Sequence, residues 1–277
     1  MRFPVLFCAL VALVAPLCAA EPPLVTAKAA LLFDANTGRV LFKKNENEPR
    51  AVASTQKLLT ALIVAEAGDL SKPVKVAATD TQCEPTKIGI RAGQTFTRTQ
   101  LLNALLVKSG NDVARALARD NAGSQQAFAE RMNSTMRRLG GTNSNFINPN
   151  GLPADGQYST ARDMARVARA AYRNPTLREI MRTRYYTFRF PSGNSISLRN
   201  TNRVLRNYSF CNGMKTGYTV RAGHCLISSG TYNGRDVIAV VLGSNKARVW
   251  DESVRLLAFG LGISPAQMEL LRITSTQ

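Results

Sequence analysis

The sequence predicts a mixed α/β protein of the α+β type, in which both ends of the chain build one antiparallel sheet and helices fill the middle. Apolar runs of strand length lie at Ala29–Phe33 and Arg39–Phe42 and return only after residue 185. The segment between them has helical periodicity. A doubly wound parallel sheet fits less well, because regular alternation of strands and helices is missing.

The elements follow in order from local signals. Asp34-Ala35-Asn36-Thr37-Gly38 separates the first two apolar runs and predicts a hairpin. Ser54–Ala67 is apolar on nearly all sides, which predicts a helix buried in a core. Thr97 and Gln100 form a capping box that opens a helix over 101–107. Further helices are expected around 112–118, 125–139 and 161–172, with one more after Asn174-Pro175.

The C-terminal part returns to strands. We expect them at 185–190 and 195–198 around a turn, then at 213–217, 223–228 and 237–242, before a closing helix over 248–260. The prediction is therefore a single domain over residues 21–277. Its sheet would use 29–45 and 185–262, and its helical insert would span about 70–184.

Residues 1–20 are predicted to be a signal peptide. Arg2 precedes an almost wholly apolar run from Phe3 to Leu17, and small residues follow at Cys18-Ala19-Ala20. An uncleaved membrane anchor is the alternative, but the run is short for a bilayer. Lipid attachment at Cys18 is disfavoured by Pro16-Leu17. We expect an exported protein, periplasmic or extracytoplasmic, that is soluble or peripheral.

The chain is strongly basic, with 36 Lys and Arg against 18 Asp and Glu, a formal charge of +18. Such a charge predicts attraction to an anionic partner. For an exported chain the candidates are cell-wall polymers and anionic membrane surfaces, and no nucleic acid is expected, because the charges form no compact basic tail. A solvated basic surface explains the charge equally well.

Three cysteines follow the signal peptide: Cys83, Cys211 and Cys225. Export permits disulfides, and the sequence leaves open a Cys211–Cys225 bond across two paired strands, with one thiol left over. No Cys/His cluster has the spacing of a zinc site. We expect neither a metal nor a cofactor.

Three short motifs carry the candidate chemistry, and the first is Ser54-Thr55-Gln56-Lys57. One helical turn separates Ser54 and Lys57, so their side chains share a face. A serine needs a base to become a nucleophile. Lys57 can serve only when uncharged, which burial and a second cation would favour; a lysine that extends from a core helix to solvent is the alternative. A serine–histidine–acid triad would depend on the single histidine, His224.

The second motif, Ser109-Gly110-Asn111, lies between two predicted helices. Its hydroxyl and amide either point into a cleft or cap a helix. The same triplet at Ser192-Gly193-Asn194 follows a proline between two strands, where a turn explains it.

The third motif, Lys215-Thr216-Gly217, lies on a predicted strand. Thr216 can donate to a substrate carboxylate, and Gly217 allows close backbone approach. The amide of Tyr218 could join that of Ser54 as an oxyanion hole. The alternative is a solvated strand end with a turn glycine.

In this order the motifs resemble those of the penicillin-recognising serine enzymes. Flanking segments are similar to the low-molecular-mass D-alanyl-D-alanine carboxypeptidases over about residues 29–261. These segments are Phe33–Gly38, Leu105–Asp112, Asn148–Leu152, Ser159–Met164 and Gly213–Thr219. The resemblance implies a serine β-lactamase/transpeptidase-like fold.

The resemblance also implies residue roles. Ser54 would be the acylated nucleophile, Lys57 its base and Ser109 the relay of the proton to the leaving amine. Asn111 would hold the substrate amide, Lys215 would tune the electrostatics, and Thr216 would bind the terminal carboxylate. Gly217 and Tyr218 would complete the binding strand. Arg248 resembles a family arginine that assists with the carboxylate.

Two departures bear on function. Many family members carry a C-terminal β-domain and an amphipathic anchor, and we expect neither here. No glutamate lies between Glu130 and Glu179, where class A β-lactamases place the one that activates the deacylating water. We therefore expect acylation by β-lactams rather than their efficient destruction.

The expected function is an exported serine carboxypeptidase that trims peptidoglycan stem peptides ending in D-Ala-D-Ala. The alternatives are a D,D-endopeptidase that cleaves cross-links, a β-lactamase, and a wall-binding module with a vestigial site.

Overall fold

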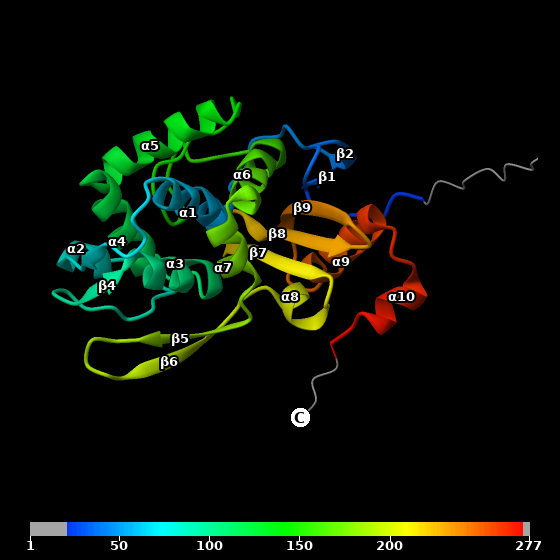
Figure 1. The fold of residues 1–277 in the computed structure, drawn as a ribbon. Helices are drawn as coiled ribbons and strands as arrows, with labels where there is room; N and C mark the ends of the chain where they lie inside the picture. The colour runs from blue at the N-terminus through cyan, green and yellow to red at the C-terminus, as the bar shows by residue number, and fades with distance from the viewer. Residues whose placement is uncertain (1–20, 274–277) are drawn as a thin grey trace, which may run out of the picture.

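The computed structural model describes residues 21–273 and contains one five-stranded antiparallel sheet with helices on both faces (Figure 1). The strand order is β2-β1-β9-β8-β7, so the two ends of the chain meet in one sheet as predicted. The strands are β1 (Ala29–Asp34), β2 (Val40–Lys44), β7 (Cys211–Thr219), β8 (Gly223–Tyr232) and β9 (Arg235–Ser244). The predicted signal peptide lies outside the described residues.

Alternation along the strands divides the hydrophobic core into two clusters. Leu31 and Phe33 of β1 belong to the cluster shared with the helical part, whereas Ala30 and Leu32 belong to the cluster packed against α9 (Val249–Leu261). Successive side chains of a strand point to opposite faces. The sheet therefore separates α9 from the rest of the helices.

The helical part surrounds α1 (Lys57–Glu66), whose residues from Lys57 to Val64 are all buried. It contacts α3, α4, α5, α6 and α7, which explains why its sequence is apolar on nearly all sides. The surrounding helices are α2 (Ala78–Thr81), α3 (Arg98–Val107), α4 (Asn111–Ala122), α5 (Gln125–Arg138), α6 (Ala161–Arg173) and α7 (Pro175–Arg182). The predicted caps at Thr97 and Asn174 are confirmed, since each side chain accepts from a backbone N–H three residues on.

One part of the predicted sheet is wrong. The strands β5 (Tyr185–Arg189) and β6 (Ser195–Arg199) pair with each other in a separate two-stranded sheet and do not join the main one. Their pattern satisfies the pairing of a hairpin, and Phe188 packs against Phe96 from the helical side. The main sheet therefore resumes at Cys211. Short elements that the sequence did not reveal are β3 (Pro73–Lys75), β4 (Thr95–Thr97), α8 (Arg203–Asn207) and α10 (Pro265–Leu270).

The Cys211–Cys225 disulfide left open by the sequence does not form. Cys211 pairs with Gly230 across β7 and β8, while Cys225 pairs with Gly217. Six residues of strand thus separate the two cysteines, about 20 Å at the rise of a β-strand, far beyond the reach of a disulfide. Cys83, Cys211 and Cys225 are all free thiols.

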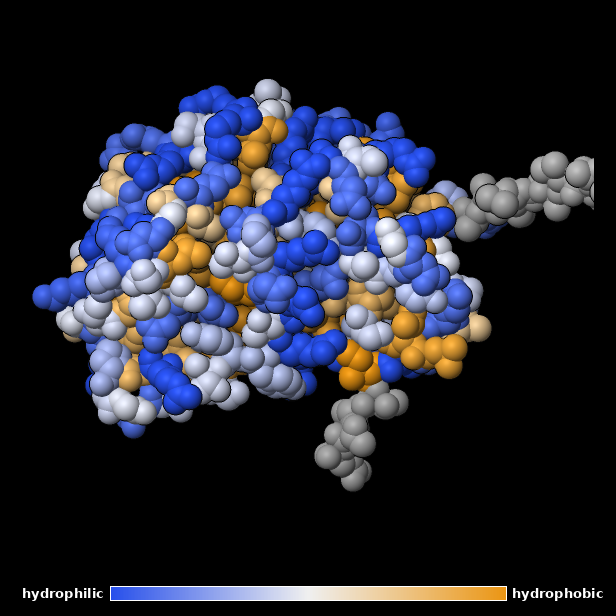
Figure 2. All heavy atoms as spheres, in the orientation of Figure 1, coloured by the Kyte–Doolittle hydropathy of each residue, from blue (hydrophilic) through white to orange (hydrophobic). Residues whose placement is uncertain are grey.

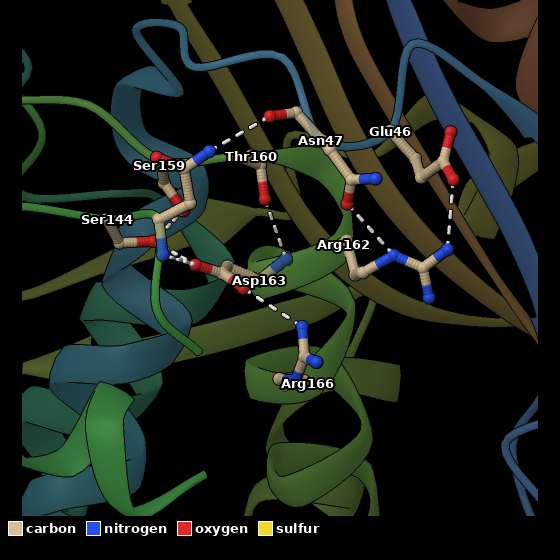
Figure 3. Close-up of polar contacts among 9 residues, drawn as sticks. Glu46, Asn47, Ser144, Ser159, Thr160, Arg162, Asp163 and Arg166 are labelled. Atoms are coloured by element: carbon tan, nitrogen blue, oxygen red, sulfur yellow. Dashed lines mark hydrogen bonds and ion pairs between the residues drawn. The ribbon is translucent and has the colours of Figure 1, made fainter. Parts of the chain in front are cut away.

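A polar cluster fixes the long connection between α5 and α6. Asp163 accepts from the backbone N–H of Asn143 at 2.9 Å and from Ser144 Oγ at 2.8 Å, and it pairs with Arg166 (Figure 3). Ser144 Oγ also lies 2.8 Å from Ser159 Oγ. These contacts close the loop 144–159 at its base, and its middle residues reach the centre of the molecule.

Hydrophilic side chains cover most of the face seen in Figure 2, and apolar ones gather along its lower edge between α8 and α10. Leu270 of α10 is 85% exposed. Within residues 21–273, no helix has both the length and the apolar character needed to cross a membrane.

Candidate active site

Ser54 lies in a 3₁₀ turn (Ala53–Gln56) that leads directly into α1. Ala53 has a φ of 48°, an uncommon conformation for a residue with a side chain. This kink turns Ser54 toward the edge strand β7. The predicted helix is therefore correct from Lys57, but the nucleophile candidate belongs to a tighter turn before it.

Gly217 of β7 is a glycine because the Ser54 backbone lies against it. A Cβ at position 217 would be 2.9 Å from the Ser54 nitrogen and 3.0 Å from that of Thr55. Such contacts are too short for any side chain. The sequence expectation of close approach at Gly217 is confirmed, and the neighbour is the turn that carries Ser54.

Lys57 is completely buried, so its amine contacts protein atoms alone. Its Nζ lies 2.8 Å from Ser54 Oγ, 2.8 Å from Asn111 Oδ1 and 2.7 Å from the carbonyl oxygen of Asn150. Burial and the nearby charge of Lys215 hold the pKa of Lys57 well below its usual range. The lysine does not extend to solvent, and it has the geometry and the electrostatic setting of a base for Ser54.

Asn111 is tied to the loop that covers it. Its Nδ2 donates to the carbonyl of Glu84 at 2.9 Å, while its backbone N–H donates to the carbonyl of Thr86 at 2.8 Å. The next residue, Asp112, is buried. Its carboxylate accepts from the backbone N–H groups of Ile88 at 3.0 Å and Gly89 at 2.9 Å. The start of α4 thereby holds the loop 84–90 over the site.

Lys215 is the second fully buried lysine, and its Nζ donates to the carbonyl of Thr216 at 2.9 Å. Burial lowers its pKa to about 7. Near neutral pH the ammonium and the amine are therefore both populated. An ammonium here disfavours a second charge on Lys57 and so contributes to the lowered pKa of Lys57.

These groups open into one cleft of about 430 Å³. Its walls come from the Ser54 turn, the loop 84–90, the Ser109 junction, strand β7, and the start of α9. Thr216 Oγ1 lies 2.7 Å from Thr201 Oγ1, and the ring of Tyr218 stacks on that of His224 with centroids 4.4 Å apart. The lining residues are Ser54, Pro85, Thr86, Lys108, Ser109, Thr201, Thr216, Gly217, Tyr218, His224, Cys225, Val249 and Trp250.

The structure thus brings together eight of the nine residues that the sequence singled out. Ser109 lines the cleft with a φ of 75°, but it is not among the groups that hydrogen-bond to Lys57 within residues 21–273. Arg248 is the exception, because its side chain is exposed and outside the cleft lining. Its backbone N–H instead donates to Asn245 Oδ1 at the start of α9.

Several cleft residues were not singled out from sequence. Asn150 acts through a backbone carbonyl, which no residue type encodes, although its segment belonged to the resemblance. Thr201 comes from the connection before α8, and Val249 and Trp250 are the first residues of α9. The second Ser-Gly-Asn triplet is confirmed as a turn, closed by a bond from the N–H of Phe190 to the carbonyl of Asn194.

No group of three or more His, Cys, Asp or Glu side chains in the described part of the chain could hold a metal ion. The donors at the cleft are hydroxyls, amines and backbone groups. What this arrangement can do chemically is deprotonate a serine, form an ester and stabilise the developing oxyanion.

A serine activated by a buried lysine, on an antiparallel sheet with a helical insert, defines the class of penicillin-recognising serine enzymes. Residues 17–246 match the Peptidase_S11 family, described as D-alanyl-D-alanine carboxypeptidase. The chain belongs to this family.

Individual relatives agree with this assignment. The D-alanyl-D-alanine carboxypeptidase DacF of Bacillus subtilis is 34% identical over 79% of this chain and 58% of its own length. The D-alanyl-D-alanine endopeptidase of Pseudomonas aeruginosa is also 34% identical, over 77% of this chain and 70% of its own. The crystal structure of the D-alanyl-D-alanine carboxypeptidase from Mycobacterium tuberculosis superposes with a TM-score of 0.84 at 31% identity, covering 91% of this chain and 97% of that one.

The chain therefore spans less than two thirds of DacF but nearly all of the mycobacterial structure. Family and fold are established by these matches. The roles of individual residues stay predictions.

Proposed function

We propose that this protein is a serine D-alanyl-D-alanine carboxypeptidase that acts on peptidoglycan stem peptides. The observation that carries the proposal is the contact of the Lys57 amine with Ser54 Oγ at 2.8 Å. Lys57 is fully buried, and its amine also bonds to Asn111 and Asn150. Membership of the Peptidase_S11 family supports the same substrate class.

In the acylation step, Ser54 Oγ attacks the carbonyl carbon of the penultimate D-alanine, and its proton passes to the neutral Lys57 amine. The backbone N–H groups of Ser54 and Tyr218 would stabilise the oxyanion. As the C–N bond breaks, Ser109 relays a proton to the departing amine, and free D-alanine leaves. Thr216 would bind its carboxylate, with the Lys215 ammonium adding attraction.

Deacylation requires a water to attack the ester. The loop next to Ser54 presents the carbonyl of Asn150 to the Ser54–Lys57 pair. A carbonyl accepts hydrogen bonds but is no general base, so Lys57 is the proton acceptor for this step as well. Because no glutamate lies between Glu130 and Glu179 to activate the deacylating water, a β-lactam would acylate Ser54 and leave slowly, and a chromogenic cephalosporin should be turned over poorly.

Covalent labelling tests the proposal. A fluorescent penicillin should label the wild type and not Ser54→Ala, and a D-Ala-D-Ala pentapeptide should lose one alanine with the wild type alone. Equal label on both proteins would contradict the assignment of Ser54. A wall-binding module with a vestigial site would instead bind sacculi with no label and no turnover.

Endopeptidase action on cross-links is the second candidate. Relatives from Pseudomonas aeruginosa and Escherichia coli are named D-alanyl-D-alanine endopeptidase, at 34% and 30% identity. Both reactions share the acyl-enzyme and differ only in the leaving amine. Mass spectrometry of products from a defined cross-linked muropeptide mixture separates them.

We also propose export through residues 1–20 and contact with an anionic wall polymer or membrane surface. The formal charge of +18 supports this contact. Binding to sacculi or anionic vesicles should then weaken steeply as salt screens the charges. Binding that is unchanged up to about 0.5 M salt, several times the ionic strength at which surface charges are screened beyond ~8 Å, would contradict it.

A further inference from the structure

A second cavity, of about 250 Å³, adjoins the catalytic cleft. Trp250 lines both and forms the wall between them. The cavity lies between α8 and α9, and Tyr208 and Arg272 line it as well. The Trp250 Nε1–H is buried and has no hydrogen-bond partner in the described part of the chain.

The cavity begins where the proposed carboxylate site ends. Thr216 Oγ1 contacts Thr201 Oγ1 at 2.7 Å, and the next residue, Asn202, caps α8 by accepting from the N–H of Val204 at 2.9 Å. Arg203 therefore follows the cleft-lining Thr201 by two positions and itself lines the cavity. A leaving group that extends past the carboxylate at Thr216 meets Trp250 and Arg203 next.

Positive charge accumulates on this side without acidic partners. The Arg203 guanidinium lies 5.3 Å from the centroid of the Trp250 ring. Among residues 21–273, the ion pairs do not include Arg199, Arg203 or Arg206. Burial, together with the charges of Arg199 and Arg203, lowers the pKa of Arg206, as expected for clustered cations.

Other charged residues nearby are already neutralised. Asp251, the one carboxylate in the cavity lining, pairs with Arg255 at 2.7 Å, and Arg272 pairs with Glu269 at 3.2 Å. On the opposite side of the sheet, Arg162 pairs with Glu46. Among residues 21–273, Arg203 is thus the cavity-lining cation that has no ion-pair partner, and it is exposed beside the Trp250 ring.

We propose, resting on the peptidase function above, that this cavity binds the leaving strand of a cross-linked peptide that carries free carboxylates. The scissile bond joins the D-alanine carbonyl to an amine of that strand. Ser54 takes the acyl group, and the strand departs with the relayed proton on its amine. Arg203 binds a carboxylate of the departing strand through charge-assisted hydrogen bonds, and the Trp250 and Tyr208 rings pack on its aliphatic carbons.

The test compares two substrates on each protein: a linear D-Ala-D-Ala pentapeptide and a cross-linked peptide dimer with free carboxylates. In Arg203→Gln, the ratio of kcat/KM for the dimer to that for the linear peptide should fall about 10-fold, as expected for loss of one charge-assisted contact. Arg137→Gln, an exposed arginine on α5, is the matched control and should leave the ratio unchanged.

An amidated dimer completes the cycle. For the wild type, kcat/KM for the amidated dimer should be about 10-fold lower than for the dimer with free carboxylates. For Arg203→Gln, kcat/KM should be equal for the two dimers. An unchanged ratio in Arg203→Gln, with penicillin labelling intact, overturns the leaving-strand site alone. Loss of wild-type labelling on Ser54 overturns the peptidase function itself, so the two failures are distinguishable.

Discussion

Lys57 Nζ and Ser54 Oγ are 2.8 Å apart, one turn from each other, and the amine is sealed from solvent by its other two acceptors on Asn111 and Asn150. A lysine in this setting is costly to charge. The pair therefore behaves as a serine with a ready base rather than as a hydroxyl hydrogen-bonded to an ammonium.

The pH dependence of acylation follows from this pair. The pKa of Lys57 is lowered by burial and by Lys215, so the active, neutral amine increases as pH rises through the lowered value. Penicillin acylation should therefore rise with pH and reach a plateau below the usual lysine range. Lys57→Arg, which keeps a charge, should slow acylation about 10³-fold. Stopped-flow labelling measures both, and a flat profile from about pH 5 to 9, across which such a base must titrate, would contradict it.

Lys215 makes stability depend on pH. Its folded pKa of about 7 lies below the unfolded value of 10.5, so between these values the unfolded chain binds a proton that the folded one lacks. Stability then rises with pH, by about 2 kcal/mol between pH 7 and 9 for this group. Urea unfolding should show a rise in both proteins, because the lowered pKa of Lys57 contributes as well, but the rise in Lys215→Met should be smaller by about 2 kcal/mol.

The pH range of this stability measurement must end near pH 9, because above it the buried thiols make stability fall as pH rises. Burial raises the pKa of Cys225 to about 11 and that of Cys211 to about 12. Above their unfolded pKa the unfolded chain loses protons that the folded one keeps, and stability falls. Lys75→Met, at an exposed position of β3, is the control, and an equal pH slope in Lys215→Met would contradict the prediction.

Close backbone packing predicts the effect of Gly217→Ala. The added Cβ would lie 2.9 Å from the Ser54 nitrogen, so the Ser54 turn must shift by several tenths of an ångström. A misplacement of about 1 Å at a reacting group can cost about 10²-fold in rate, so this smaller shift should cost roughly 10-fold. Penicillin acylation should fall by that factor while circular dichroism is retained. Gly230→Ala, whose Cβ would first meet Leu261 Cδ1 at 3.1 Å, should lose stability without losing acylation.

The sequence predicted those parts of the molecule that local chemistry determines. The hairpin at Asp34–Gly38, the buried helix after Ser54 and the cap at Thr97 each depend on residues that are close in the chain. The single antiparallel sheet built from both chain ends was also predicted and is confirmed, although its strand partners, such as Leu31 of β1 with Val240 of β9, were not. The ordered motifs identified Ser54, Lys57, Asn111 and Lys215.

The misses share a cause in long-range structure. Nothing local distinguishes β5 and β6 from strands of the main sheet, but they pair with each other, and Phe188 of β5 packs against Phe96 of the helical part. A Cys211–Cys225 bond could only be left open, because the register of β7 on β8, which keeps the two cysteines apart, is set over the whole hairpin. Arg248 was placed by resemblance; its side chain is exposed and is not among the residues that line the cleft, so its role stays a prediction. The cavity beside Trp250 forms because α8 and α9 pack side by side. No local sequence pattern predicts that packing.

Asp112 gives the last prediction, since it connects the loop over the cleft to the electrostatics of the base. Its carboxylate accepts from the N–H groups of Ile88 at 3.0 Å and Gly89 at 2.9 Å, and its charge acts to raise the pKa of Lys57. Asp112→Asn places an amide donor against these N–H groups. Hydrogen bonds to a charged group contribute about 1.5–3 kcal/mol each, so unfolding free energy should fall by about 2–4 kcal/mol.

A second readout separates this role from simple destabilisation. With the negative charge removed, Lys57 should be easier to deprotonate, and the midpoint of the acylation profile should move to lower pH in the folded variant. Asp155→Asn, exposed in the loop before α6, should change neither stability nor midpoint. A destabilised Asp112→Asn whose midpoint stays at the wild-type pH would show that Asp112 supports the loop without tuning the lysine.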